Sequence, residues 1–220
     1  MPHFQISTPS ATPLPNDFQS IILRSSRRAL QASPKSLFLS KQNKAKMKKL
    51  FLAATVSMFV LAGCNSGPKM TPIEYNDTII GEQTKISKVM IEMANNFSSD
   101  LGKSEALRQD LVKQCEASIK VVKELPEYKG NVKFRDAGAA LFGFYKEISD
   151  KEYKEMIDIL KKEQIEVADI ERLTTLEKEI SARETPLDDT FQSAQQEFAK
   201  EHNLSLKENE IQGQINELGK

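Results

Sequence analysis

The 220-residue sequence contains no tryptophan, two cysteines and two histidines, and these scarcities exclude several kinds of protein. Two cysteines cannot build a disulfide framework, so the fold has to be held together by packing. A di-metal site of the helical-bundle type needs two histidines, each with a glutamate three positions earlier. The two histidines are His3 and His202, and the position three residues before His202 is alanine. The sequence therefore predicts no metal and no other cofactor, and Ser-His-Asp or Cys-His catalysis would require His202 to meet a nucleophile.

The chain also has no excess charge of either sign, but the charges are divided unevenly along it. Residues 1–63 contain nine Lys or Arg and a single acid, Asp17, whereas the remainder contains 22 bases and 30 acids. A basic leader therefore precedes an acidic body. Because an acidic surface repels polyanions, nucleic acid is not expected as a partner.

A basic segment followed by a short apolar one lies in the middle of the leader. Met47-Lys48-Lys49 precedes thirteen mostly apolar residues, 50–62. Thirteen residues are too few to cross a bilayer core of roughly 30 Å as a helix, but they have the length of the apolar region of a signal peptide. The sequence therefore predicts a signal peptide over residues 47–63.

The signal peptide ends in Leu61-Ala62-Gly63-Cys64, which resembles the lipobox of bacterial lipoproteins. That resemblance implies cleavage between Gly63 and Cys64, a diacylglyceryl thioether on Cys64 and a further acyl chain, such as palmitate, on the new amino terminus. Two or three acyl chains anchor a protein stably where one chain is marginal. The membrane, reached through this lipid anchor, is then the first expected partner. The alternative is a buried apolar helix that ends in a cysteine by chance.

Residues 1–46 precede a complete signal peptide and are rich in Ser, Pro, Gln and Arg. They have no sustained apolar period, so we expect a disordered leader. A misplaced start, with translation beginning at Met47, explains them best, and a genuine extension is the alternative. Asn65 replaces the aspartate that retains enterobacterial lipoproteins in the inner membrane, which favours the outer membrane and leaves open whether the domain faces the periplasm or the exterior.

Past the tether at residues 64–71, apolar residues recur at helical spacings of three and four, which predicts a helical domain over 72–205. Thr71-Pro72-Ile73-Glu74 is a helix start with a capping box, and Ser104 is a candidate cap for the next helix. The pattern predicts helices over about 72–97, 104–125, 131–160 and 170–202, followed by a polar tail at 206–220. We expect a restart at Ser149, a kink or restart at Pro186 and a left-handed terminator at Asn203.

No segment alternates in the way that a β-strand requires, so the predicted fold class is all-α. Long amphipathic helices with short connections favour antiparallel neighbours, hence an up-and-down antiparallel bundle of about four long helices. The narrow apolar stripes also predict local coiled-coil packing.

The most unusual segment of the predicted domain is rich in small residues where a helix is expected. It contains Gly138, Phe142, Gly143, Phe144 and Tyr145, together with three alanines. Because glycines lower helix propensity, something has to approach this backbone closely. A neighbouring helix is one explanation, and a pocket for an apolar ligand beside the aromatic residues is the other.

Other reactive side chains have ordinary explanations. Cys115 shares a face with Leu111 and Ile119, which favours a buried apolar role over a reactive thiol. Acid-rich stretches such as 177–179 and 188–189 match no calcium-loop spacing, so solvated helix faces are preferred to a cation site. His202, near a helix end, is expected at the surface.

Three short segments carry a further resemblance. Glu74-Tyr75-Asn76-Asp77, Phe144-Tyr145-Lys146 and Phe191-Gln192-Ser193-Ala194-Gln195 are similar to segments of a family of uncharacterised surface lipoproteins found in Bacteroidota and leptospires. The resemblance covers roughly residues 70–205 and implies no activity and no functional residues.

These observations lead to two hypotheses for function. The first is a lipid-anchored cell-envelope lipoprotein whose non-catalytic helical bundle has a structural or protein-interaction role, with an unknown envelope protein as partner. The second is a carrier of a small apolar ligand that uses the segment around Gly138 and Gly143. An enzyme is the third and least supported possibility.

Overall fold

The computed structural model describes residues 70–97 and 99–206. The leader, the signal peptide with Gly63, the lipidation candidate Cys64 and the tail from residue 207 lie outside these ranges. Within them the chain is all-α, with no strand, as the sequence predicts. The helices are α2 Pro72–Asn96, α3 Leu101–Lys123, α4 Lys133–Asp150, α5 Glu152–Leu160 and α6 Val167–Glu201.

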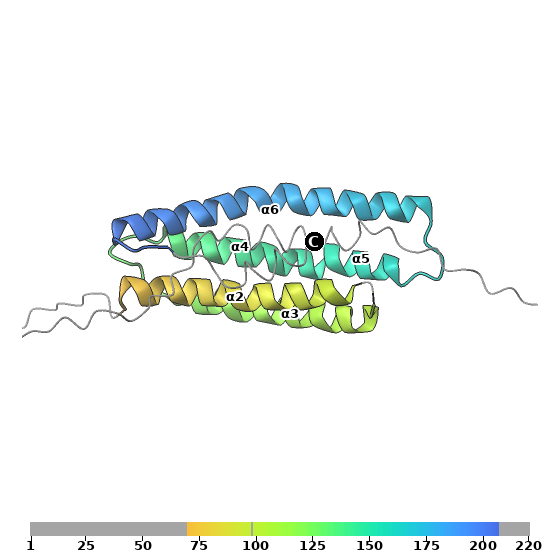
Figure 1. Ribbon diagram of the computed structural model, residues 1–220, viewed down its shortest axis with the longest axis horizontal. Helices are drawn as coiled ribbons and strands as arrows, with labels where there is room; N and C mark the ends of the chain where they lie inside the picture. The colour runs from red at the N-terminus through yellow and green to blue at the C-terminus, as the bar shows by residue number, and fades with distance from the viewer. Residues whose placement is uncertain (1–69, 98, 207–220) are drawn as a thin grey trace, which may run out of the picture.

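The helices form an up-and-down bundle in which α5 continues α4 as one rod (Figure 1). Successive rods run in opposite directions, so α6 begins at the end of the bundle where α2 finishes. The backbones of α2 and α3, of α3 and α4, and of α4 and α6 approach closely, whereas those of α2 and α6 barely do. The bundle therefore has three closely packed sides and one that only side chains span. None of the described helices is both long enough and apolar enough to cross a membrane.

The predicted start of the first helix is confirmed. The Thr71 Oγ1 accepts from the Glu74 amide at 3.2 Å, and the Glu74 carboxylate accepts from the Thr71 amide at 2.8 Å. Pro72 occupies the first helical position, where its missing N–H removes no bond. The Thr71 amide and hydroxyl both donate to the Glu74 carboxylate, and these bonds hold the pKa of Glu74 below its usual range.

The predicted cap of the second helix is wrong. α3 begins at Leu101, because the Asp100 Oδ1 accepts from the Lys103 amide at 2.8 Å and so caps the helix four residues before the predicted cap. Ser104 lies inside the first turn, where its hydroxyl donates to the Asp100 carbonyl at 2.9 Å. A carboxylate is at least as good a cap as a hydroxyl, so the earlier start is preferred.

The rod formed by α4 and α5 is interrupted next to Ser149, where the sequence predicts a restart, but Ser149 does not cap the second helix. α4 ends at Asp150 and α5 begins at Glu152, with Lys151 between them making no side-chain cap. The Ser149 hydroxyl donates back to the Tyr145 carbonyl at 2.6 Å. Ser149 is buried and occupied in this way, so it does not cap α5.

Of the kink or restart predicted at Pro186, the restart does not occur, whereas the terminator at Asn203 is confirmed. α6 runs through Pro186 as one helix of 35 residues and is bowed, highest near its middle (Figure 1). A proline inside a helix removes one hydrogen bond, and curvature accommodates it. Asn203 takes the left-handed conformation with φ 53°, and the Leu204 amide donates to the Ala199 carbonyl at 2.8 Å.

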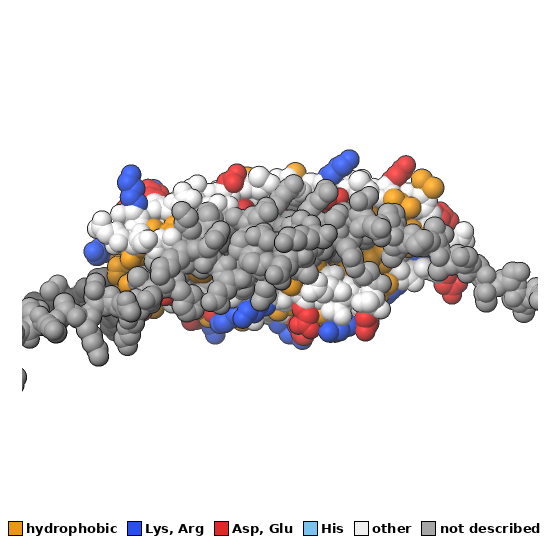
Figure 2. Space-filling model, in the orientation of Figure 1, with side chains coloured by type: hydrophobic (Ala, Val, Ile, Leu, Met, Phe, Trp, Pro, Cys, Tyr) orange, Lys and Arg blue, Asp and Glu red, His pale blue; other side chains and the backbone are white. Residues whose placement is uncertain are grey.

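The predicted apolar stripes form one continuous core. It includes Ile79, Met90, Leu111, Leu141 and Phe191, all fully buried. Ile170 is the exception, because it remains 41% exposed in the first turn of α6, beside Val167 at 74%. These two side chains leave an apolar spot at the end of the bundle where α6 begins, which is visible in Figure 2.

Candidate functional site

The two glycines of the small-residue segment lie in different surroundings on α4. A Cβ on Gly138 would lie 3.2 Å from the Ile79 Cγ2 and 3.3 Å from a ring carbon of Phe191, so α2 and α6 side chains occupy the space beside it. A Cβ on Gly143 would meet no atom within 4 Å. The close approach expected of this segment is therefore made at Gly138 by the neighbouring helices.

The three aromatic residues that were candidates for an apolar pocket point to different parts of the bundle. Phe142 is fully buried, with its ring 6.3 Å from that of Phe191. Phe144 lies under the guanidinium of Arg183, 5.2 Å from the ring centre. Tyr145 donates its hydroxyl to the Glu184 Oε1 at 3.2 Å. The chain's own side chains therefore take up these aromatic faces, and the three do not line one cavity together.

An open groove of about 630 Å³ does run along the outer side of α4 and α6. Small side chains form its floor, including Ala137 and Ala140 from α4 and Ala194 from α6, and charged residues form its rim. The ion pair between Lys133 and Glu197, 2.8 Å long, connects the two helices beside it. Two of the three alanines of the predicted segment, Ala137 and Ala140, thus line this groove, although none of the five named glycine and aromatic residues does.

The side of the bundle between α2 and α6 is lined by polar residues with mirrored spacing. Asn76, Gln83 and Ser87 follow one another at seven and four residues on α2, and Gln195, Asp188 and Glu184 do so in the reverse direction on α6. All six are buried. The Gln195 amide donates to the Asn76 Oδ1 at 3.1 Å and sets the antiparallel register. That register places Gln83 opposite Asp188 and Ser87 opposite Glu184. We call these six residues the α2–α6 seam.

In the seam, the Ser87 Oγ and the Asp188 Oδ1 have no hydrogen-bond partner within the described part of the chain. The other carboxylate oxygen of Asp188 accepts from the Gln192 side chain at 3.0 Å. Asp188 is only 6% exposed, and this burial raises the pKa of its carboxyl to about 7. Because a buried charge without full compensation is costly, the seam is the least satisfied part of the described interior.

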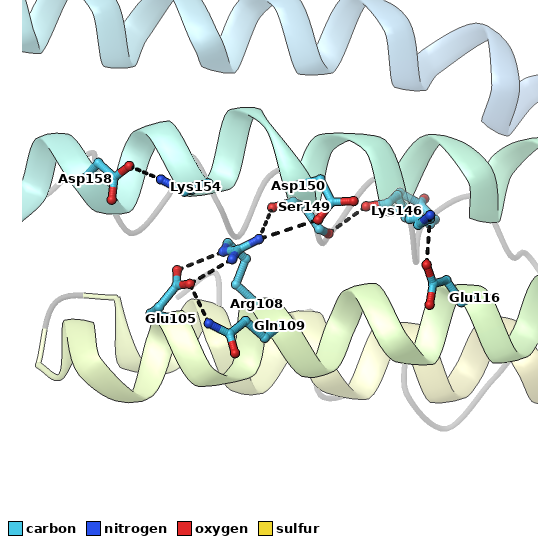
Figure 3. A network of polar contacts seen from close by, with 10 residues as sticks. Glu105, Arg108, Gln109, Glu116, Lys146, Ser149, Asp150, Lys154 and Asp158 are labelled. Carbon is cyan, nitrogen blue, oxygen red and sulfur yellow. Dashed lines mark hydrogen bonds and ion pairs between the residues drawn. The ribbon is translucent and has the colours of Figure 1, made fainter.

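A second polar cluster joins α3 to the break between α4 and α5 (Figure 3). The Arg108 guanidinium donates to both carboxylate oxygens of Glu105, at 2.7 and 2.8 Å, and to the Ser149 carbonyl at 2.9 Å. Arg108 is buried, and its bonds hold the pKa of Glu105 down to about 2. The Asp150 carboxylate adds a longer contact of 3.8 Å. Arg108 therefore satisfies a carbonyl next to the break in the α4–α5 rod, which gives it a structural role.

The remaining reactive side chains, Cys115 and His202, both pack against other side chains of the bundle. Cys115 is buried, and desolvation raises the pKa of its thiol to about 12, so the nucleophilic thiolate is suppressed. His202, the C-cap residue of α6, is partly exposed at the helix end and packs its ring edge-on against Phe198 and Tyr128, 4.6 and 4.9 Å between centres. Across residues 70–97 and 99–206, no three His, Cys, Asp or Glu side chains are grouped to hold a metal ion.

Neither the buried cluster around Arg108 nor the seam was predicted from the sequence. The seam had a signal, since Asn76, Gln83 and their counterparts on α6 fall on the apolar stripes, where a polar residue marks a helix face with polar contacts. No local pattern indicated a role for Arg108, because the carbonyl that it contacts belongs to Ser149, 41 residues away in the sequence. Comparisons with protein-family models, curated proteins and solved structures find no match to this chain.

Proposed function

We propose that the chain is the precursor of a lipid-anchored cell-envelope lipoprotein whose non-catalytic bundle has a structural or protein-interaction role. The observation that carries this proposal is the sequence Leu61-Ala62-Gly63-Cys64 directly after a basic and then an apolar segment. Cleavage before Cys64 would release a mature chain that begins with its own lipid attachment site. The outer membrane is the proposed location.

The short tether between Cys64 and α2 determines which end of the bundle would face the membrane. Seven residues separate Cys64 from Pro72, where α2 begins, and a fully extended chain of that length reaches about 28 Å. The end of the bundle with the start of α2 would therefore face the membrane. α6, with 35 residues, is about 52 Å long, so its first turn would stand that far from the membrane-facing end.

Features of the described domain support an interaction role over a chemical one. The thiol of Cys115 is buried and its pKa is raised, which suppresses the nucleophilic thiolate. The most exposed large apolar side chain, Val167, lies in the first turn of α6 with Ile170, at the far end from the tether. Visible acidic and basic side chains are interspersed over the described surface (Figure 2). An envelope protein that contacts the far end would meet an apolar spot with a charged surround.

The anchor is tested by acylation of the full-length chain in a bacterial host supplied with labelled palmitate. We expect label in the parent and in Cys115→Ser, and none in Cys64→Ser. Mass analysis should find an amino-terminal, lipid-modified Cys64. An intact peptide in which an unmodified Cys64 is still joined to Gly63 would overturn the anchor and the location with it.

The interaction role is tested by photo-crosslinking in cells. A photoreactive residue at Val167 or Ile170 is expected to capture a specific envelope protein, whereas the same residue at exposed Glu127, near the membrane-facing end, should not. If positions on every helix face capture nothing, the interaction role is wrong even where the anchor is correct.

A further inference from the structure

The short helix α5 has a joint at each of its ends. At Lys151, where φ is −112° and ψ is −76°, the backbone departs from the values typical of a helix. The Lys151 amide ends the ladder of α4 by donating to the Glu147 carbonyl at 3.1 Å, and the Glu155 amide begins that of α5 by donating to the Lys151 carbonyl at 2.9 Å. At its other end, α5 is joined to α6 by the six non-helical residues 161–166, five of which are exposed. Side-chain contacts therefore decide how firmly α5 is held.

One side chain of α6 connects the two helices across the break at Lys151. The Arg183 Nη2 lies 2.9 Å from the Glu147 Oε1 on α4, and the Arg183 Nη1 donates to the Glu152 Oε1 on α5 at 2.6 Å. Arg108 approaches the same break from α3, but its contacts on the rod belong to α4. Arg183 is therefore placed to hold α5 in line with α4, which Arg108 is not.

Glu152, in the first turn of α5, depends on Arg183 to compensate its charge. The Glu152 side chain is only 13% exposed. Its Oε1 accepts from Arg183, and its Oε2 is buried and has no hydrogen-bond partner among residues 70–97 and 99–206. An enclosed carboxylate is costly unless it is paired. If the bond to Arg183 is lost, a movement of α5 that brings Glu152 to water relieves this cost.

We propose that α5 is a hinged segment that opens from the bundle as a unit, turning at Lys151 and in the 161–166 connection, and that Arg183 is the strap that holds it closed. A helix of nine residues is too short to be stable alone, so its order depends on its packed face and on this strap. α5 lies at the end of the bundle where α6 begins (Figure 1). Opening exposes there three side chains that are fully buried in the closed bundle, Tyr153, Met156 and Ile157. This inference does not depend on the lipid anchor.

The hinge is tested by amide hydrogen exchange of the full chain, followed by mass spectrometry in peptides from α4 and from α5. In the parent, the α5 amides should exchange faster than those in the middle of α4. Arg183→Met should accelerate exchange in α5 by about fivefold or more, because the segment then opens more often. Exchange in the middle of α4 should stay nearly unchanged. Thermal melting establishes that each variant is folded at the temperature of exchange.

Two further variants separate the strap from a general loss of stability. Arg172→Met removes an α5–α6 pair with Glu155 in which the side chains are 41% and 42% exposed, so it should accelerate exchange in α5 by less than about twofold. Adding Glu152→Gln to Arg183→Met removes the enclosed charge and should restore most of the protection, which lost arginine packing alone would not. Equal acceleration in α4 and α5, no rescue by Glu152→Gln, or equal exchange rates of the two helices in the parent would overturn the proposal.

Discussion

The interface of α3 with α4 and the seam between α2 and α6 both contain polar side chains in the interior. They differ in whether those polar groups have hydrogen-bond partners. In the first, every polar group of Arg108 and Glu105 that faces the interior has a described partner, and the backbones pack closely. In the second, Ser87 and Asp188 each retain a buried oxygen without one among residues 70–97 and 99–206. A polar group inside a protein stabilises only when it is satisfied, so the two regions should respond oppositely to mutation.

The contrast shows that polarity in the interior does not by itself indicate stability or function. Each region contains an acid with a shifted pKa: that of the half-buried Glu105 is lowered to about 2 by Arg108, and that of the buried Asp188 is raised to about 7 by burial. The direction of the shift reports whether the charged form has found compensation. It therefore separates a completed network from an incomplete one.

The largest effect is expected on the completed side. Arg108→Met should lower the free energy of unfolding by about 2 to 3 kcal/mol, because it leaves the buried Ser149 carbonyl and the half-buried Glu105 carboxylate without their donor. Arg172→Met is the matched control, since Arg172 makes a similar bidentate pair with Glu155 but is 41% exposed. It should cost less than about 1 kcal/mol. Urea denaturation measures both, and equal losses would contradict the structural role given to Arg108.

Two serines on the α2 interfaces sharpen the comparison. The Ser118 hydroxyl donates to Glu82 and accepts from Gln114, whereas the Ser87 hydroxyl has no described partner. Ser118→Ala should therefore lower the free energy of unfolding by about 1 to 2 kcal/mol, and Ser87→Ala should change it by less than about 0.5 kcal/mol. Thermal melts of the two variants in the same buffer compare these two losses of stability. A larger loss for Ser87→Ala would mean that its oxygen is satisfied in solution.

The helices and the core of this chain could be predicted from local patterns. Thr71 with Glu74, the apolar stripes and Asn203 each act within one turn of the chain, and all three predictions are confirmed. The two wrong predictions, the cap at Ser104 and the restart at Pro186, involve choices between local options. Asp100 competes with Ser104 for the same helix start, and packing along 35 residues of α6 outweighs the bond lost at Pro186.

The polar clusters could not be predicted in this way, because their partners are distant in the sequence. Arg108 meets a carbonyl 41 residues away, and Asn76 meets Gln195 at a separation of 119 residues. The small-residue segment was noticed, but whether Gly138 faced a helix or a ligand depended on where Ile79 and Phe191 lie. Periodicity identifies the face of a helix, and only the packed structure identifies what that face contacts.

The pH dependence of the seam provides a third test. The folded-state pKa of Asp188, about 7, lies above its ordinary value of 3.8, so the folded protein binds this proton more tightly than the unfolded chain. The stabilisation from its protonation is complete below about pH 4 and is lost as the pH rises through 7. Asp188→Asn should thus gain about 1 to 2 kcal/mol over the parent at pH 8 and little at pH 4.

The measurement is the difference in unfolding free energy between Asp188→Asn and the parent across this range, so that other carboxylates cancel. Groups near Asp188 include Glu184, Asp189 and Gln192 on α6, with Gln83 and Ser87 opposite on α2. Asp189→Asn is the control: this neighbouring residue is exposed, and its charge raises the pKa of Asp188 less than burial does, so its difference from the parent should vary much less with pH. A flat profile for Asp188→Asn would show that the seam hydrates its carboxylate.

The smallest effect is expected at the two glycines of α4, where helix propensity and space can be separated. Gly143→Ala should raise the free energy of unfolding by about 0.5 to 1 kcal/mol, because alanine restricts the unfolded chain and its Cβ meets no atom within 4 Å. Gly138→Ala has the same propensity gain, but its Cβ would press on Ile79 and Phe191 at 3.2 and 3.3 Å. Since the propensity contribution is common to both, the difference between the two melting temperatures measures the contact alone. If Gly138→Ala stabilises as much as Gly143→Ala, the side chains of α2 and α6 yield easily there, and the centre of the bundle is less closely packed than its geometry indicates.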